Sequence, residues 1–318
     1  LPAPPADNCS KDASINSQDK LNQIAGCKDF SGSITIDGAS VGTINLGNME
    51  SISGDLTIQN IGSLTSIDLP KLESVGKLTI SNNTALSALN LNDLEKINSF
   101  VVSGNPSLSA LAVPKGFDSM DTFRLLDSSL KQLPLFNFTT VTNFELYGNR
   151  NLNNITLANL GQVKGFLSVV NNSPSAVLNL PQLTNVAQNC TFANLKELNA
   201  ESLKKVQSNL NVQDNYFSDF SLDKLTDVSS SVSVINNADL ESFTFKNLAA
   251  IGGNLLVVNN TKIGALDGFP ALETVEGTID VRGSFKNVTF DSLDKVKGSF
   301  TIKSTEAISC DKLKSAYG

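Results

Sequence analysis

Histidine is absent from this 318-residue sequence, and its absence excludes several kinds of chemistry at once. Ser-His-Asp and Cys-His nucleophilic systems need an imidazole base, and many zinc sites use at least one imidazole ligand. Tryptophan is also absent and tyrosine occurs three times, so the stacking platform common in sugar-binding grooves is not evident. The sequence therefore argues against nucleophilic catalysis and against histidine-containing metal sites.

Other catalytic and binding motifs are missing too. The four cysteines have no Cys-x-x-Cys spacing, and the sequence contains neither a glycine-rich phosphate loop nor an EF-hand loop. We therefore expect no cofactor and no metal. The remaining enzymatic alternative is a polysaccharide-active β-helix that uses carboxylates, which would need several acidic or basic side chains clustered on the outer side of adjacent coils.

Charge and hydropathy limit the kinds of partner that we expect for this chain. Charged residues make up 17 % of the chain, the net charge is −7, and lysine and arginine are scattered singly. With no basic patch to neutralise phosphates, we expect no nucleic-acid partner and no binding to anionic lipid. No run approaches eighteen apolar residues, and the start, Leu-Pro-Ala-Pro-Pro-Ala, has neither a basic nor an apolar leader region. We expect a processed N-terminus.

A repeat runs through nearly the whole chain. Short segments of the form Leu/Ile-x-Ile/Val-x-Asn recur every 20 to 24 residues, as in Asp55-Leu-Thr-Ile-Gln-Asn. The second apolar position of this column is occupied in turn by Ile36, Ile58, Ile80, Val102, Leu125, Leu146, Val169, Phe192, Val212, Val234, Val257, Val281 and Ile302. Such a period is typical of a solenoid in which each coil buries its apolar face against its neighbours.

The residues between these segments indicate strands and corners. In Leu64-x-x-Ile67-x-Leu69-x-x-Leu72-x-x-Val75, the two-residue step is typical of strands and the three-residue steps of bends. We therefore predict an all-β fold, a parallel β-solenoid of about thirteen coils. Residues 1–30 are expected to form an N-terminal arm and capping helix, with Ser14–Ala25 helical, and residues 31–318 one continuous solenoid with a truncated C-terminal cap.

Asparagine recurs at the fifth strand position, for example at Asn60, Asn82 and Asn236. We expect these side chains to turn inward and stack as a ladder that satisfies backbone groups at the corner. A ligand site is the alternative.

One outward strand position is mostly apolar over consecutive coils. We call this row the stripe, and it consists of Leu126, Tyr147, Val170, Ala193, Gln213, Ile235 and Val258. It could be a surface that binds a protein partner or a glycan, a face covered by a loop or by a second copy in a homodimer, or a reflection of β-propensity alone. On the preceding outward position carboxylates are isolated, and Arg124 and Glu145 are expected to form a surface ion pair.

The cysteines are expected to play different roles. Cys9 and Cys27 flank the capping helix and are the favoured disulfide, whereas Cys190 falls on an inward position and is expected to be a buried free thiol. Cys190 and Cys310 lie about five coils apart, roughly 24 Å, which is too far for a disulfide. Cys310 is expected to pair with a cysteine beyond Gly318.

Eight Asn-x-Ser/Thr sequons are present, close to the number that chance gives for this composition. We expect glycans at Asn137, Asn154 and Asn287, which project from the outer pattern, and we count Asn8 and Asn189 as further candidates. The sequons at Asn82, Asn171 and Asn259 occupy the ladder position and are expected to be unmodified.

Together the repeat, the Cys9 and Cys27 pair and the late Cys310 resemble the fungal GPI-anchored cell-wall organisation proteins, whose repeats are similar to the receptor L-domain. The resemblance implies secretion, N-glycosylation, a serine-rich stalk, a GPI anchor, and a role in wall organisation and integrity without catalytic residues. It places the protein at the outer leaflet of the plasma membrane and in the cell wall. The sequence departs from the family in lacking the stalk and anchor region. A receptor-like ligand binder is a further alternative.

Overall fold

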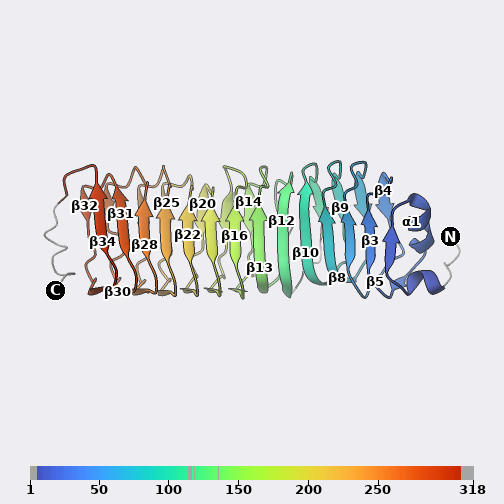
Figure 1. Ribbon diagram of the computed structural model, residues 1–318, viewed down its shortest axis with the longest axis horizontal. Coiled ribbons are helices and arrows are strands. Elements are labelled where there is room, and N and C mark those ends of the chain that lie inside the picture. Colours follow the sequence, from blue (N-terminus) through green and yellow to red (C-terminus); the bar gives the residue numbers. More distant parts are fainter. Residues whose placement is uncertain (1–5, 114–116, 118, 135, 309–318) are drawn as a thin grey trace. The chain divides into compact units, whose positions relative to one another are not determined.

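The structure is a computed structural model that describes residues 6–113, 117, 119–134 and 136–308. The chain divides into two compact units, unit 1 (Leu1–Leu152) and unit 2 (Asn153–Gly318). In both, successive turns of the chain stack as parallel strands (Figure 1), so the predicted parallel β-solenoid of about 13 turns is confirmed. That residues 31–318 form one continuous solenoid remains a prediction.

Unit 1 contains two sheets and two short helices. The helices are η1 (Ala6–Cys9) and α1 (Gln18–Ile24). The first sheet contains β1 (Ala13–Ile15), β2 (Asp29–Phe30), β3 (Ile34–Asp37), β5 (Ser51–Ile52), β6 (Leu56–Gln59), β8 (Ser74–Ser81), β10 (Lys96–Asn105), β12 (Ser119–Ser128) and β13 (Thr140–Tyr147). The second sheet contains β4 (Thr43–Asn45), β7 (Ser66–Asp68), β9 (Ala88–Asn90) and β11 (Ala110–Ala112).

Unit 2 repeats this plan with shorter strands. Its first sheet contains β15 (Gln162–Val163), β16 (Leu167–Val170), β18 (Asn185–Val186), β19 (Cys190–Ala193), β21 (Lys205–Val206), β22 (Leu210–Gln213), β24 (Asp227–Val228), β25 (Val232–Ile235), β27 (Ala250–Ile251), β28 (Leu255–Val258), β30 (Thr274–Val275), β31 (Ile279–Gly283), β33 (Lys295–Val296) and β34 (Phe300–Ser304). Its second face holds three small sheets: β14 (Asn154–Thr156), β17 (Val177–Asn179) and β20 (Glu197–Asn199); β23 (Asp219–Ser221) and β26 (Ser242–Thr244); and β29 (Ala265–Leu266) and β32 (Asn287–Val288).

A complete coil consists of three strand segments. In the second coil these are β5, β6 and β7, and each pairs in parallel with the same segment of the next coil. A bend separates the first two segments at Gly54, where a Cβ atom would lie 2.7 Å from the carbonyl oxygen of Gly32 in the coil before. Glycine therefore allows successive coils to approach closely at this bend.

The core follows the alternation that the repeat predicts. In β6, Leu56 and Ile58 are fully buried, while Thr57 and Gln59 are partly exposed. Because strand side chains alternate between faces, every second apolar residue points inward and stacks on its counterpart in the next coil.

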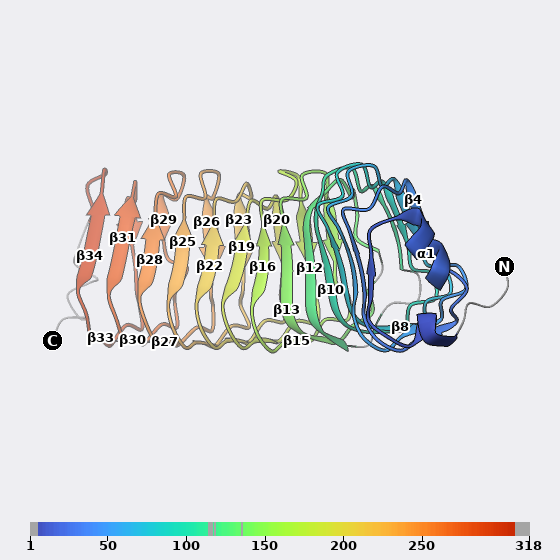
Figure 2. The same cartoon turned by 45° about the vertical axis from the view of Figure 1, so that its right-hand side comes forward.

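The N-terminal cap differs in part from the prediction. Figure 2 shows α1 at the N-terminal end of unit 1, and its Leu21 and Ile24 are buried. The helix does not begin at Ser14 as expected, because residues 13–15 form β1, which pairs with β3 and places Ile15 opposite Ile36. Strand pairing at this edge satisfies the backbone groups of β3, and the helix starts later, after Ser17 as N-cap.

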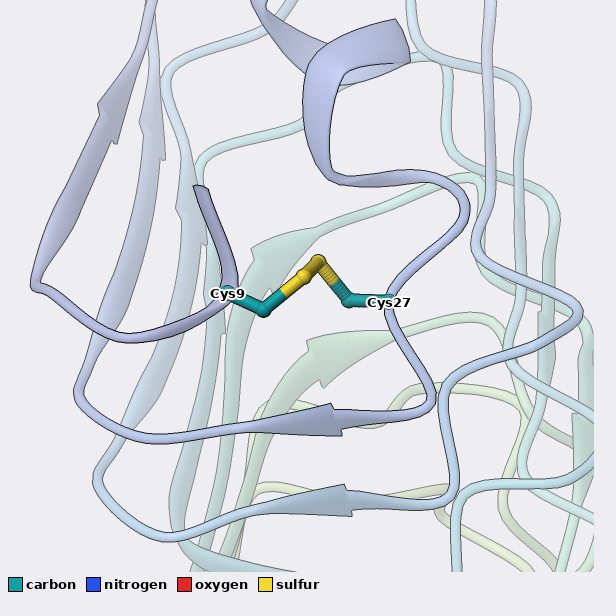
Figure 3. Close-up of a disulfide and its surroundings, with 2 residues drawn as sticks. All are labelled: Cys9 and Cys27. Carbon is teal, nitrogen blue, oxygen red and sulfur yellow. A yellow bond between two sulfur atoms is a disulfide. The ribbon is translucent and has the colours of Figure 1, made fainter. Parts of the chain in front are cut away.

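Cys9 and Cys27 form a disulfide that ties the chain before β1 to the chain after α1 (Figure 3), the pairing that the sequence favours. Residues 10–26, which include β1 and α1, are thereby closed into a loop. Cys190 is buried and free, and Cys310 lies outside the described residues.

The expected asparagine ladder exists, but it is formed by the residue after the predicted one. Asn60 and Asn82 are exposed and adopt positive φ angles of 59° and 55°, as do Asn171, Asn236 and Asn259. This left-handed conformation turns the chain at the corner, so the next side chain points inward. The prediction that the fifth-position amides turn inward is therefore wrong. The fully or almost fully buried amides are Asn83, Asn105, Asn149, Asn172, Asn215, Asn237 and Asn260.

These buried amides bond from coil to coil. The Asn105 Oδ1 atom accepts the backbone N–H of Asn83 at 3.1 Å and the Asn83 Nδ2–H at 3.2 Å, and Asn105 Nδ2 donates to the carbonyl of Ile80. Asn237 does the same in unit 2, where it accepts from Asn215 and donates to the carbonyl of Val212. The ladder thus satisfies the backbone groups that the corner leaves unpaired.

Candidate functional site

The stripe lies on the outward side of the first sheet at the end of each second strand segment. In unit 1, Leu126 and Tyr147 are paired neighbours in β12 and β13. Tyr147 is 42 % exposed, and it is one of the two large hydrophobic residues with high exposure among the described residues. The unit 1 part of the stripe is therefore a small apolar surface with a projecting aromatic ring.

The unit 2 part of the stripe spans consecutive strands. The register aligns Ala193 with Gln213, Gln213 with Ile235, and Ile235 with Val258. Val170 ends β16, which pairs with β19. All are partly exposed except Ala193, which is 1 % exposed. Its short methyl side chain lies below the level of longer neighbours, so Ala193 does not contribute the open surface that the sequence suggests.

Two ion pairs lie beside the stripe, one in each unit. In unit 1 the Nε atom of Arg124, two residues before Leu126, lies 2.7 Å from Oε2 of Glu145 in the next strand, so the expected ion pair is present. In unit 2, Arg282 follows Val258 in the register and donates from Nε and Nη2 to the two carboxylate oxygens of Asp280.

The same strand position is polar in the first coils of unit 1. There the register joins Asp37, Gln59, Ser81 and Ser103 before it reaches Leu126. The Gln59 and Asn60 amides donate to the two carboxylate oxygens of Asp37 at 3.0 and 2.9 Å and lower the pKa of that carboxyl. The stripe of unit 1 is thus bounded on one side by a polar surface whose side chains are hydrogen-bonded to one another.

In the part of the chain that the structure describes, no three His, Cys, Asp or Glu side chains gather as a metal site. Burial raises the pKa of the Cys190 thiol, which lies in the core and lines no surface. A partly apolar, in-register row with paired charges at its border can bind a partner by covering apolar area.

The sequons fall into two classes. The candidates Asn137, Asn154, Asn189 and Asn287 are exposed, and Asn8 is partly exposed. The corner sequons at Asn82, Asn171 and Asn259 are exposed as well, contrary to the expectation that they point inward. The signal for this was in the sequence, because the fifth position holds asparagine, aspartate or glycine, the residues that tolerate positive φ.

Among the described residues, no helix has the length and apolar character needed to cross a membrane.

Comparisons with known proteins place the chain among fungal surface proteins. It is 31 % identical over 307 residues to a cell surface GPI-anchored protein of Arthroderma benhamiae, which covers 96 % of this chain and 79 % of that protein. It is 28 % identical over 316 residues to protein ecm33 of Aspergillus fumigatus, covering 98 % and 79 % of the two chains. Sporulation-specific protein 2 of Saccharomyces cerevisiae is 31 % identical over 294 residues, which are 92 % of this chain and 58 % of that one. No family model matches, and no solved structure matches.

Proposed function

Because the chain belongs to the family of fungal GPI-anchored cell-surface and cell-wall proteins, we propose that it supports the organisation of the wall without catalysing a reaction. It is an extracellular protein of the cell surface and wall, and its relatives carry the names of wall proteins rather than of enzymes. In this proposal the stripe contacts a wall polysaccharide or another wall protein, and a GPI anchor joins the protein to the membrane.

One observation carries the proposal, namely that each unit presents a row of outward side chains, most of them apolar, beside an ion pair. Tyr147 in unit 1 and Ile235 in unit 2 are its large members. Burying such a row against a partner removes apolar area from water, while the neighbouring ion pairs Arg124–Glu145 and Asp280–Arg282 impose no unpaired charge on the interface.

The test is co-sedimentation of the purified chain with insoluble fungal wall. We expect the wild-type protein to pellet with the wall and Tyr147→Asp or Ile235→Asp to pellet at least tenfold less. Ser81→Asp is the matched control, since it adds the same charge at the same strand position in the polar part of unit 1, and it should pellet like the wild type. Equal retention of all variants would show that the stripe is ordinary surface, and release of reducing ends from the wall would contradict a non-catalytic role.

N-linked glycans form a second part of the proposal. The exposed acceptors Asn137, Asn154, Asn189 and Asn287, and the partly exposed Asn8, are the sites that we propose to be modified. Peptide mass spectrometry after enzymatic deglycosylation in heavy water marks each occupied asparagine by its conversion to labelled aspartate. Unlabelled peptides at all five positions would contradict the assignment.

A further inference from the structure

A groove of about 700 Å³ lies on the second face of unit 1, on a different sheet from the stripe. Its floor is formed by β9 and β11, and its wall by residues 130–134 of the following coil. This volume lies within the range of about 300–1,000 Å³ that is usual for small-ligand sites.

The groove exists because the outward side chains become short along this sheet. One outward row runs Thr43, Ser66, Ala88, Ala110, and the other runs Asn45, Asp68, Asn90, Ala112. Three alanines thus meet in adjacent strands and leave a flat apolar floor. The charge at this place is low, because Lys131 is the one ionisable side chain among the lining residues that the structure describes.

The sheet also ends at this place within unit 1. Ile44, Ile67 and Leu89 are buried on the inner side of their strands, but the corresponding residue of β11, Leu111, is partly exposed and lines the groove. The next coil begins beside β11, since the Ser129 N–H donates to the Leu108 carbonyl at 2.9 Å, and it then departs from the strand path. The hollow is therefore local, and residues 130–134 form its wall.

One polar atom at the groove has no partner. Asn90 Nδ2 donates to Asp68 Oδ1 at 2.7 Å, and exchange of the amide's N and O atoms would bring two acceptor oxygens together. The Asn90 Oδ1 atom therefore points away from Asp68, and Ala112, the register partner of Asn90 in the next strand, has no donor side chain. Among the described residues, the Asn90 Oδ1 atom is buried and accepts no hydrogen bond. A hydrogen-bond donor placed beside this oxygen would therefore be stabilising.

We propose that this groove is a subsite for one neutral pyranose unit of a wall glycan. The sugar's C–H face would lie on Ala88, Ala110 and Ala112, and a sugar hydroxyl would donate to Asn90 Oδ1. Because the terminal torsion of asparagine has a broad energy well, a small rotation of the amide brings this oxygen to the floor of the groove. We favour a pyranose over a peptide, since its flat apolar face carries hydroxyl donors at the rim, where one of them can meet Asn90 Oδ1.

The inference rests on the proposed role in the wall, but it concerns a separate site. It is tested by NMR titration of alanine-methyl-labelled protein with four hexaoses, of β-1,3-glucose, β-1,6-glucose, α-mannose and β-1,4-N-acetylglucosamine. We expect at least one of them to shift the methyl signals of Ala88, Ala110 and Ala112 in a saturable way. The buried methyls of Ala176 and Ala200 in unit 2 should not respond.

Two variants should close the groove in different ways. Ala112→Asn supplies the missing donor to Asn90 Oδ1, so it should weaken sugar binding at least tenfold without lowering the melting temperature. Ala110→Leu fills the floor from an exposed position and should have the same effect on binding. Ser66→Asn adds the same amide to the same sheet outside the groove and should bind like the wild type.

The inference is overturned if none of the hexaoses shifts these methyls, or if Ala112→Asn and Ala110→Leu bind as well as the wild type. A response to a neutral Gly-Ser hexapeptide with none to any sugar would overturn the sugar assignment. Failure here is distinguishable from failure of the stripe, because Tyr147→Asp and Ile235→Asp should lose wall retention while the alanine methyls still respond to the sugar.

Discussion

The two units use the same coil plan but differ in how regular it is. In unit 1, β8, β10, β12 and β13 each run through the bend as strands of eight to ten residues, and the second face is one sheet of four strands. In unit 2 the corresponding strands are interrupted at the bend, and the second face is divided into three small sheets. The first sheet is not divided in this way in either unit. This indicates that the pairing of its strands keeps successive coils aligned.

Coil length explains one of these breaks. In β20 Glu197 follows the corner residue Asn194 by three positions, whereas in β23 Asp219 follows the corner residue Asp214 by five. The shortened coil places Leu195 where the ladder has asparagine, and beyond it the strands β20 and β23 are not paired. A change in corner length is therefore absorbed by the second face, while Cys190–Ala193 and Leu210–Gln213 remain in register on the first.

The position of the stacked aromatic rings also differs between the two units. In unit 1 Phe100, Phe123 and Phe144 stack along one strand column, with centroids 5.4 and 5.1 Å apart. In unit 2 Phe220 and Phe243 stack beneath the interrupted second face, at 5.4 Å. The rings thus stack within the long strands of the first sheet in unit 1, but within short strands of the second face in unit 2.

The largest expected effect concerns the buried ladder. Asn237→Ala removes an acceptor for the Asn215 backbone N–H and a donor to the Val212 carbonyl, so we expect a loss of about 3–5 kcal/mol in the free energy of unfolding. Asn105→Ala should cost a similar amount in unit 1. Hydrogen exchange resolved by peptide shows which unit loosens in each variant, and a loss below 1 kcal/mol in both would refute the structural role of the amides.

Loss of the disulfide should affect unit 1 alone. Replacing Cys9 and Cys27, which are 18 positions apart, by serine removes the constraint on the unfolded chain and should cost about 3 kcal/mol. The expected result is faster hydrogen exchange in residues 10–37 with unchanged exchange in unit 2. Cys190→Ser serves as the contrasting variant, since it places a hydroxyl in the core of unit 2. If the double serine variant accelerated hydrogen exchange equally in both units, the prediction that the disulfide stabilises unit 1 alone would be wrong.

The corner residues should give a smaller effect, with the same sign in both units. Asn82→Ala in unit 1 and Asn236→Ala in unit 2 force a Cβ-bearing residue with no local hydrogen bond to keep a positive φ, at a cost of about 1 kcal/mol each. Glycine at either position should be close to neutral, because it adopts this conformation freely. Chemical denaturation of the two pairs of variants measures the difference, and an alanine variant as stable as the glycine variant would show that the corner is not strained.

The smallest effect is expected from pH. Hydrogen bonds lower the pKa of Asp37 in unit 1 and, in unit 2, those of Asp239 and Glu276, so these groups stabilise the fold when ionised. This stabilisation is present above the carboxyl pKa values of the unfolded chain, near 4, and is lost as pH falls through the lower folded values. With no histidine, melting temperature should stay level between pH 5 and 8 and fall below pH 4 in both units. A transition near pH 6.5 would contradict this.

Much of the fold follows from the repeat, because inward and outward positions alternate in every strand. The column from Ile36 to Ile302 was assigned correctly, and so was the ion pair between Arg124 and Glu145. The ladder was displaced by one residue because the positive φ at Asn60 and its equivalents reverses the alternation at the corner. Periodicity carries no information about that reversal, although residue type does.

The groove could not be predicted in the same way. It depends on which alanines become neighbours across coils, on the path of residues 130–134, and on the orientation of a single amide at Asn90. The first of these follows from the register once the coils are aligned. The others depend on packing that leaves no pattern in a single sequence.

The buried ladder also has a direction, and this direction has an evolutionary consequence. Each ladder oxygen accepts from the coil before it, and each amide N–H that continues the row donates to the coil after it, as at Asn83, Asn215 and Asn237. A coil that is duplicated whole therefore carries both the donor and the acceptor that its new neighbours need. The gene can lengthen such a protein by copying one repeat, whereas gaining or losing a few residues within a coil alters the pairing of the second face, as the shortened coil at Asn194–Glu197 records.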